Sequence, residues 1–217
     1  MGGEPVNHRT VKGNQSERCK PVFSSSRYRA LWCARRLKRL TAFLCLAIAG
    51  SCASPNTPPL EATDRKVDLE RFMGNWYVIG FIPVTIPFFS EKGAHNGVES
   101  YRLTEAGVIE TTYTFRQGAF DGPEKRLTPK GWVHDTETNA EWRMQFLWPF
   151  KAAYLIVYLD EDYQRTIIGV PDRKHVWIMS RDPELSDADY EEMLARAERL
   201  GYDSDEVQRV PQQWRAE

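Results

Sequence analysis

The chain has 217 residues, with 29 basic and 30 acidic side chains, and its formal net charge is −1. The charge is unevenly distributed: residues 1–52 carry ten Lys or Arg and two acidic residues, whereas residues 53–217 carry nineteen basic and twenty-eight acidic ones. The acidic part excludes a nucleic-acid partner, because binding to phosphates requires clustered Lys and Arg. Its length, about 165 residues, suits one domain with a well-filled core.

The cysteines divide the chain at the same point. All four of them, Cys19, Cys33, Cys45 and Cys52, lie in the basic part. The acidic part therefore has no disulfide, no thiol nucleophile and no cysteine ligand for a metal.

The basic part has the layout of a secretory signal. Residues 35–39 are positively charged, residues 40–49 are apolar, and Gly50 and Ser51 lead to Cys52. Such an apolar stretch is too short to span a membrane as a mature helix. The segment resembles the lipobox of a bacterial lipoprotein, in which Cys52 would be lipidated and begin the mature chain. A signal that is simply cleaved, or an uncleaved N-terminal anchor, is the alternative.

Two segments flank this signal and have no predicted fold. Residues 1–34 are polar and without hydrophobic periodicity, so we expect residues 1–52 to be a disordered leader that ends in the signal. Residues 53–66 contain three prolines and several small polar residues, which is typical of a tether. The folded domain is predicted to cover residues 67–217.

That domain begins with a short helical turn and continues as strands. Residues 68–73 suit one helical turn, after which runs of aromatic and β-branched residues alternate with turn residues. Residues 140–147 show the clearest period-two alternation of apolar and polar side chains. Eight strands are predicted, at residues 76–82, 97–103, 108–115, 126–134, 140–147, 153–159, 163–170 and 175–181.

After Pro183 the periodicity becomes helical. Ser186 is a good N-cap, the apolar residues that follow recur at helical spacing, and Gly201 stands where a helix would end. The fold class is therefore all-β: an eight-stranded antiparallel up-and-down barrel with a C-terminal α-helix packed on its outside. A barrel of eight strands is just wide enough to hold one small ligand.

The two ends of the strand series meet in such a barrel. The first strand starts, and the eighth ends, at the same end of the barrel, so Trp76 and Arg181 are predicted to lie together. A guanidinium on an indole face is a favourable cation–π contact, which strengthens when it is desolvated. We expect Gly74, Trp76 and Arg181 to close this end as structural residues.

Three motifs resemble those of the lipocalin family. Gly74-Asn75-Trp76-Tyr77 matches its G-x-W signature after a helical turn, Asp162-Tyr163 matches the second signature, and Arg181 matches the third. Residues 169–181 resemble the corresponding sequence of the bacterial outer-membrane lipoprotein group related to apolipoprotein D. The resemblance covers residues 67–214. The loop at residues 83–96 is longer and more apolar than the family implies, so no role is carried over to it.

The strand directions also predict which loops surround the open end of the barrel. The loops 83–96, 117–125, 148–152 and 171–174 are predicted to ring it, and they hold five aromatic residues: Phe88, Phe89, Phe120, Trp148 and Phe150. Such a rim would sit against a membrane or cover an apolar ligand. The alternative is that these rings pack on each other as loop cores.

Parity along the strands predicts which side chains face the interior, and for residues 97–103 the resemblance to the family, through Tyr101, implies which face that is. The predicted ligand-binding residues are Glu99, Tyr101, Trp142, Met144, Phe146, Tyr154, Ile156, Tyr158, Trp177 and Met179. Core filling alone would also explain most of them. Glu99 and Tyr101 are the stronger candidates, because a buried polar group needs a partner or a ligand head group. An apolar cavity with a few polar anchors suits a fatty acid or a lysophospholipid.

Motifs for catalysis are missing from the sequence. The four histidines have no metal-ligand spacing, and no nucleophile elbow, phosphate-binding glycine loop or HExxH is present. We therefore predict no catalytic residues, no metal and no cofactor. The leading hypothesis is a non-catalytic protein that binds or transports a hydrophobic lipid ligand. A lipid-modifying enzyme on the same barrel, or an envelope structural protein, is the alternative.

The expected partners follow from the same features. They are the lipid ligand, a membrane reached through a lipid anchor on Cys52, and a second copy of the chain in a homodimer. The expected location is the outer membrane, with the domain facing the periplasm.

Overall fold

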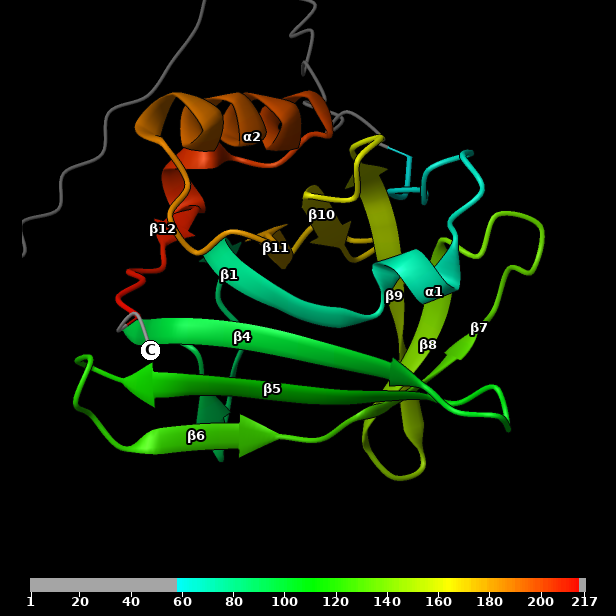
Figure 1. The fold of residues 1–217 in the computed structure, drawn as a ribbon, viewed down its shortest axis with the longest axis horizontal. Helices are drawn as coiled ribbons and strands as arrows, with labels where there is room; N and C mark the ends of the chain where they lie inside the picture. Colours follow the sequence, from blue (N-terminus) through cyan, green and yellow to red (C-terminus); the bar gives the residue numbers. More distant parts are fainter. Residues whose placement is uncertain (1–57, 215–217) are drawn as a thin grey trace, which may run out of the picture. The chain divides into compact units, whose positions relative to one another are not determined.

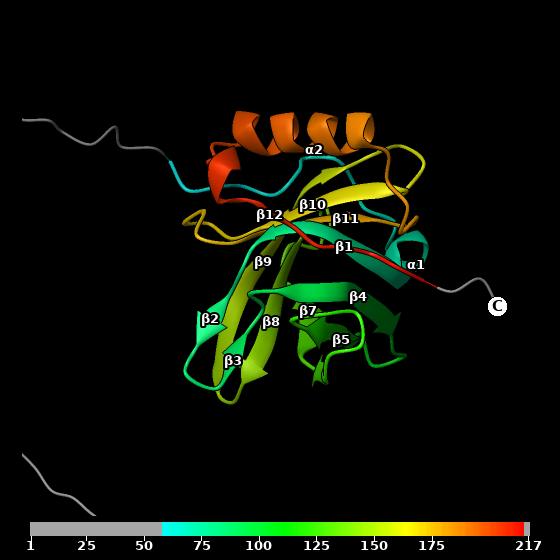
Figure 2. The same ribbon diagram turned by 90° about the vertical axis from the view of Figure 1, so that its left-hand side faces the viewer.

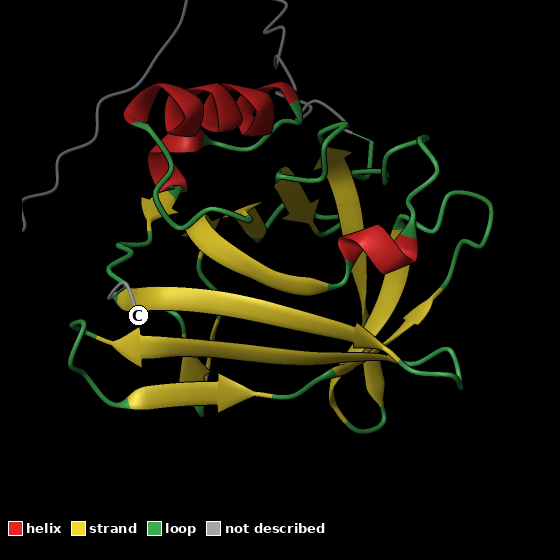
Figure 3. Cartoon of the chain, viewed as in Figure 1, coloured by secondary structure: helices red, strands yellow, loops and turns green. Residues whose placement is uncertain are grey.

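The computed structural model describes residues 58–214, which form a closed antiparallel β-barrel (Figure 1). Strands make up most of its regular secondary structure, and one long helix lies outside the ring (Figure 3). In order around the ring, the strands are β1 (Gly74–Ile82), β4 (Ala94–Leu103), β5 (Ile109–Gln117), β6 (Glu124–Leu127) with β7 (Lys130–Val133), β8 (Glu141–Leu147), β9 (Phe150–Leu159), β10 (Arg165–Gly169) and β11 (Val176–Ser180). The pairing of β11 with β1 closes the ring, and the predicted eight-stranded barrel is confirmed.

One predicted strand, residues 126–134, is divided into β6 and β7. The break falls at Thr128 and Pro129, because proline has no N–H to donate to a ladder. The carbonyl of Pro129 still accepts a hydrogen bond from the Thr111 amide at 3.1 Å. Both pieces pair with β5, so the division leaves the order of the barrel unchanged.

Strand β5 shows how the barrel separates its two faces. Ile109, Thr111, Tyr113 and Phe115 are buried, whereas the residues between them are partly exposed. Alternate side chains of a strand point to opposite faces, so these four face the interior.

The long helix α2 (Asp187–Arg199) covers one side of the barrel, over β10 and β11 (Figures 1 and 2). As predicted, the Ser186 hydroxyl caps it by accepting the Asp189 amide at 3.1 Å. Met193 and Ala197 of the helix pack with Ile167 and Ile178 of the barrel. The helix therefore stabilises the outside of the barrel and contributes nothing to its interior.

Short elements complete the fold. These are α1 (Leu69–Phe72) before β1, the hairpin β2 (Thr85–Ile86) and β3 (Phe89–Ser90) after it, the 3-10 helix η1 (Ser204–Glu206), and β12 (Gln208–Arg209), which pairs with β1. The hairpin lies in the segment predicted as a loop. None of the helices in residues 58–214 is long and apolar enough to cross a membrane.

Residues 58–66, which were expected to belong to a tether, lie along the barrel. Leu60 is buried, its amide donates to the Pro171 carbonyl at 2.9 Å, and the Thr63 amide donates to the Ile156 carbonyl at 2.8 Å. A Cβ on Gly169 would come within 2.6 Å of the Leu60 side chain, so this glycine makes room for the segment. The predictions for residues 1–57, Cys52 included, fall outside the described residues.

Candidate ligand-binding site inside the barrel

The interior of the barrel is lined by aromatic and aliphatic side chains from all around the ring. Of the predicted binding residues, eight are buried, and the apolar and aromatic ones belong to one interior cluster. These eight are Glu99, Tyr101, Trp142, Met144, Tyr154, Ile156, Trp177 and Met179. The structure thus brings them together from β4, β8, β9 and β11; their contact with a ligand stays a prediction.

Phe146 was predicted to face the interior, and the structure corrects this. Its side chain is 53% exposed. The neighbouring strand β7 begins at Lys130, which lies opposite Gln145, so Phe146 lies beyond the last residue that β7 covers. Phe146 therefore belongs to the projecting end of the β8–β9 hairpin.

Tyr158 was also predicted to face inward, and it faces outward instead. The pairing of β9 with β10 shifts by one residue, from Tyr158 opposite Ile167 to Ile156 opposite Ile168. Such a bulge reverses the parity of every residue beyond it. Tyr158 consequently packs on the helix side of the barrel, where the guanidinium of Arg196 lies 4.3 Å from its ring centroid.

The centre of the interior holds a buried carboxyl group bound by two phenols. Tyr101 and Tyr154 both donate hydrogen bonds to Glu99, the second at 2.8 Å, and the two phenols also contact each other. Burial raises the pKa of Glu99, and these two hydrogen bonds oppose the rise only in part. The pKa values of both tyrosines are raised well above their ordinary value, first by burial and then by the charge on Glu99.

Two further hydroxyl groups face this cluster from the next strand. Thr111 and Tyr113 of β5 lie directly opposite Tyr101 and Glu99 of β4. The Thr111 hydroxyl is buried without a hydrogen-bond partner, and the Tyr113 hydroxyl has none of good geometry, although it lies close enough to Glu91 to lower the pKa of that carboxyl group. An unpartnered buried hydroxyl costs about 1–3 kcal/mol, which a ligand or a water molecule would offset. In the sequence, the alternation of residues 109–115 would have indicated that Thr111 and Tyr113 face inward.

A second buried carboxyl group, Glu91, was not predicted from the sequence. Its Oε2 accepts the Val84 amide at 2.6 Å, and its Oε1 accepts the Trp177 indole N–H at 3.1 Å. Burial raises the pKa of Glu91 to about 7; the two donors lower it, and the charge on Glu99 raises it further. Glu91 follows β3 in a segment without periodicity, so no sequence pattern indicated that its side chain is buried.

The predicted closing residues meet at the end of the barrel that α1 covers. The guanidinium carbon of Arg181 lies 3.9 Å from the Trp76 ring centroid. Arg181 also donates to the carbonyls of Arg71, Phe72, Met73 and Asn75, at 2.6–2.9 Å. Burial lowers its pKa to about 10, which leaves it charged at neutral pH.

Gly74 and Trp76 fit this end for separate reasons. Gly74 has φ +93°, a conformation that favours glycine, and a Cβ there would lie 3.3 Å from Arg181 Nη1. The indole N–H of Trp76 donates to the Phe72 carbonyl at 2.8 Å, and Phe72 itself packs against Trp142. This end of the barrel is therefore filled by structural contacts.

The predicted second motif also supports this end. Tyr163 is buried and its hydroxyl accepts the Asp68 amide at 2.9 Å, which holds the residue that caps α1. The guanidinium of Arg71 lies 3.9 Å from the centroid of the same ring. Asp162-Tyr163 is thus part of the closure.

Of the five aromatic residues predicted at the rim, four are exposed and one is packed. Phe88 is 98% exposed, Trp148 79% and Phe150 72%, and Phe120 is also exposed. Phe89 instead packs on the interior, with its ring centroid 5.7 Å from that of Phe115. Phe120 packs edge-on against His95, with centroids 4.8 Å apart. Neither of these two contacts joins two of the five rim rings, so they do not support the alternative that the rings pack on each other as loop cores.

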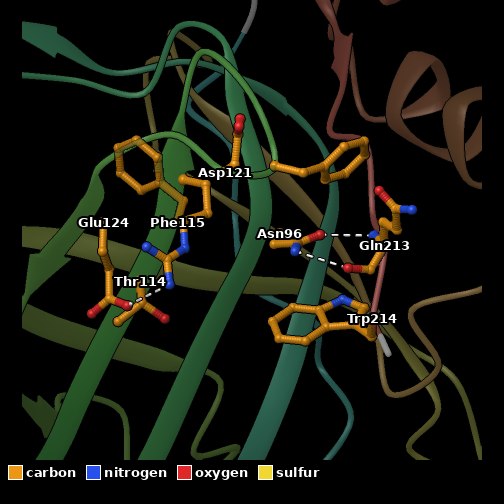
Figure 4. A pocket seen from close by; sticks show the side chains of 9 residues that line it. Asn96, Thr114, Phe115, Asp121, Glu124, Gln213 and Trp214 are labelled. Carbon is orange, nitrogen blue, oxygen red and sulfur yellow. Dashed lines mark hydrogen bonds and ion pairs between the residues drawn. The ribbon is translucent and has the colours of Figure 1, made fainter. Parts of the chain in front are cut away.

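A separate hollow of about 420 Å³ lies near the end of β5 (Figure 4). It is lined by Asn96, Thr114, Phe115, Arg116, Phe120, Asp121, Glu124, Gln213 and Trp214. Asn96 fixes the C-terminal segment there, because its amide exchanges two hydrogen bonds with the Gln213 backbone, at 2.7 and 2.9 Å. None of the predicted binding residues lines this hollow.

Comparisons with known proteins agree with this geometry. Residues 67–212 match the family model of the lipocalin-like domain. The chain is 32% identical to outer membrane lipoprotein Blc of Escherichia coli (strain K12) over 165 residues, which cover 75% of this chain and 86% of that protein. It is 28% identical to temperature-induced lipocalin-1 of Arabidopsis thaliana, over 67% of this chain and 80% of the relative.

A solved structure, that of the allergen Per a 4 from cockroaches, superposes with a TM-score of 0.51 at 19% identity, over 73% of this chain and 96% of that one. At that identity the likeness shows the fold alone. The family match, by contrast, covers the barrel from Val67 to Gln212 and includes its closing residues. The chain therefore belongs to the lipocalin family.

Proposed function

We propose that this protein binds, stores or transports a hydrophobic small molecule, a fatty acid or a lysophospholipid, without changing it chemically. The observation that supports the proposal is the barrel interior, where an apolar wall surrounds the polar group of Glu99, Tyr101 and Tyr154. An apolar site with a few polar anchors is typical of a site for an amphiphilic ligand.

The proposed place of action is the bacterial cell envelope. Several relatives, from Escherichia coli and Citrobacter freundii, are named outer membrane lipoprotein. The sequence predicts a lipoprotein-type signal that ends at Cys52. We therefore infer that a lipid on Cys52 anchors the protein in the outer membrane, with the barrel facing the periplasm.

Native mass spectrometry of the protein after gentle extraction from membranes tests the function. We expect a co-purifying lipid whose mass does not change on incubation. Turnover of that lipid would favour a lipid-modifying enzyme on the barrel, and a protein that never carries a lipid would favour a structural role in the envelope. The same spectra report whether a homodimer forms.

The exposed end of the β8–β9 hairpin supports a membrane contact near the barrel mouth. Phe146, Leu147, Trp148 and Phe150 are exposed on this single turn, and Lys151 follows them. Aromatic rings with a nearby cation suit the interface of an anionic lipid bilayer. On the proposed function, this turn would bring the mouth close to the source of the ligand.

We predict that Trp148→Ser with Phe150→Ser weakens binding to vesicles by roughly tenfold, because two aromatic rings no longer enter the interface. The measurement is vesicle co-flotation, with Cys52→Ser in all proteins so that no anchor contributes. Trp214→Ser is the matched control, since this exposed tryptophan lies against Tyr77, away from the turn. Equal flotation of all three proteins would contradict the contact.

A further inference from the structure

The barrel interior contains two carboxyl groups that lack a cationic partner. Glu91 is 2% exposed and Glu99 7% exposed. Within residues 58–214, none of the ion pairs includes either residue. Buried carboxylates are normally paired with a cation or neutralised by a proton. The described side chains supply no cation to these two groups, so a proton balances Glu91 below its pKa of about 7, and a cationic ligand would take the place of that proton at higher pH.

Unused hydrogen-bond acceptors lie beside these carboxyl groups. Thr111 and Tyr113 face the interior in register with Tyr101 and Glu99; the Thr111 hydroxyl lacks a partner, and the Tyr113 hydroxyl has none of good geometry. Burial, the charges on Glu91 and Glu99 and a hydrogen bond to Glu91 raise the pKa of Tyr113 well above its ordinary value. A ligand with several N–H donors would satisfy these oxygens.

Aromatic rings surround the same region. Trp142 and Tyr154 are stacked with centroids 5.8 Å apart, and the centroids of Tyr154 and Trp177 are 6.1 Å apart. Trp177 also donates to Glu91, so the rings and the carboxyl groups form one continuous lining. The faces of tyrosine and tryptophan rings attract cations, and do so more strongly when water is excluded.

We propose that the polar end of the ligand is a primary ammonium group, held by Glu99 and Glu91 together with the hydroxyls of Thr111 and Tyr113. This inference rests on the proposed function, keeps its hydrophobic ligand, and replaces the fatty acid with an amphiphile that has a cationic end. An ammonium group has three N–H donors and neutralises the buried charge. A fatty acid places a third carboxylate beside two others in a medium of low dielectric constant, which is unfavourable.

The test compares three probes of equal chain length: dodecylammonium, dodecanol and dodecanoate. Each displaces the neutral dye N-phenyl-1-naphthylamine from the full chain with Cys52→Ser, at pH 8 and below the critical micelle concentration. We expect dodecylammonium to bind about tenfold more tightly than dodecanol, and dodecanoate to bind more weakly than dodecanol. Equal affinities, or a preference for dodecanoate, would overturn the inference and leave the proposed function intact. A protein that binds neither the dye nor any probe would contradict the proposed function itself.

Glu99→Gln should abolish the preference for dodecylammonium over dodecanol. Glu110→Gln is the matched control, because Glu110 is on the outward face of β5 and pairs with Arg102. Tyr113→Phe should weaken dodecylammonium binding by about threefold, because it removes one of the proposed acceptors. If Glu99→Gln fails to fold, the probe ranking of the parent protein and the effect of Tyr113→Phe decide the question. An unchanged preference in folded Glu99→Gln overturns the inference.

A pH series adds an independent readout. Dodecylammonium keeps its charge between pH 5 and pH 8, because alkylamines titrate near the lysine pKa of about 10.4. The titratable groups facing the proposed site are Glu91, Glu99, Tyr101, Tyr113 and Tyr154. Among them Glu91, whose pKa burial raises to about 7, loses its proton in this range, and the pKa values of the three tyrosines lie well above it. Affinity for dodecylammonium should rise with pH while that for dodecanol stays constant. Parallel pH profiles for the two probes contradict the assignment.

Discussion

We expect the Arg181→Ala protein to lose about 3 kcal/mol of unfolding free energy, which lowers Tm by roughly 6–12 °C. The substitution removes the donors of four carbonyls, those of Arg71, Phe72, Met73 and Asn75, together with the cation–π contact to Trp76. Those carbonyls belong to the last turn of α1 and the start of β1, so α1 packs less tightly on the closed end of the barrel. Thermal unfolding followed by circular dichroism measures the change.

Two further variants separate this effect from a general loss of positive charge. Arg102→Ala breaks an exposed ion pair with Glu110 and should change the unfolding free energy by less than about 1 kcal/mol. Arg181→Lys keeps the charge but lacks the planar fork of donors, so its Tm should fall between those of the parent and Arg181→Ala. An unchanged Tm in Arg181→Ala would contradict the closing role of this residue.

The second large effect is a loss of stability as the pH rises through the range in which Glu91 titrates. Burial raises the pKa of Glu91 from 4.5 to about 7, so between these values the folded state keeps a proton that the unfolded state has lost. The stabilising contribution is fully present below about pH 4.5 and is lost as the pH rises through about 7. The shift corresponds to about 3 kcal/mol of unfolding free energy.

Chemical denaturation at pH 5 and at pH 8 measures this dependence. Glu91→Gln should flatten it, and Glu110→Gln should leave it unchanged. Glutamine has one acceptor oxygen for two donors, the Val84 amide and the Trp177 indole, so Glu91→Gln loses a hydrogen bond at every pH. That loss lowers the unfolding free energy by the same amount at pH 5 and pH 8. The change of the unfolding free energy with pH is therefore the quantity to compare. Glu99, whose pKa is also raised, adds a change of the same sign. A slope that persists undiminished in Glu91→Gln would rule out Glu91 as its source.

Three aspartates make the unfolding free energy depend on pH only below the range from pH 5 to pH 8. The pKa values of Asp135, Asp172 and Asp189 are lowered from 3.8 by hydrogen bonds to their neighbours. In the folded protein these aspartates bind fewer protons than in the unfolded chain only near and below their ordinary pKa of 3.8. Their contributions are therefore constant between pH 5 and pH 8, and they leave the Glu91 effect visible.

The barrel was predictable from the sequence because local patterns and three separated motifs agree. Period-two alternation identified the strands, Ser186 and Gly201 bounded the helix, and Gly74-Asn75-Trp76 with Arg181 gave the closure. Alternation and helix capping depend only on residues that are neighbours in the sequence. Gly74 adopts a backbone conformation that favours glycine, so it too can be recognised from the sequence. Parity, with the resemblance through Tyr101 that fixed the face of this strand, also placed Glu99 and Tyr101 in the interior.

Parity failed where the strands depart from regular pairing. The bulge in β9 turned Tyr158 outward, and the hairpin of β8 and β9 extends past its neighbour, which exposes Phe146. Neither feature leaves a mark in the sequence, because a bulge changes the register of a strand without requiring a particular residue.

The sequence by itself determined that this protein is a closed barrel, which end of it is shut, and that Glu99 faces inward. Only the tertiary structure showed that Glu91 enters the same interior, that the Thr111 hydroxyl is unpartnered there, and that the described side chains supply no cation to Glu91 or Glu99. The reason is physical: periodicity specifies which face a side chain occupies, whereas burial, partners and charge balance depend on residues that only the closed barrel brings together.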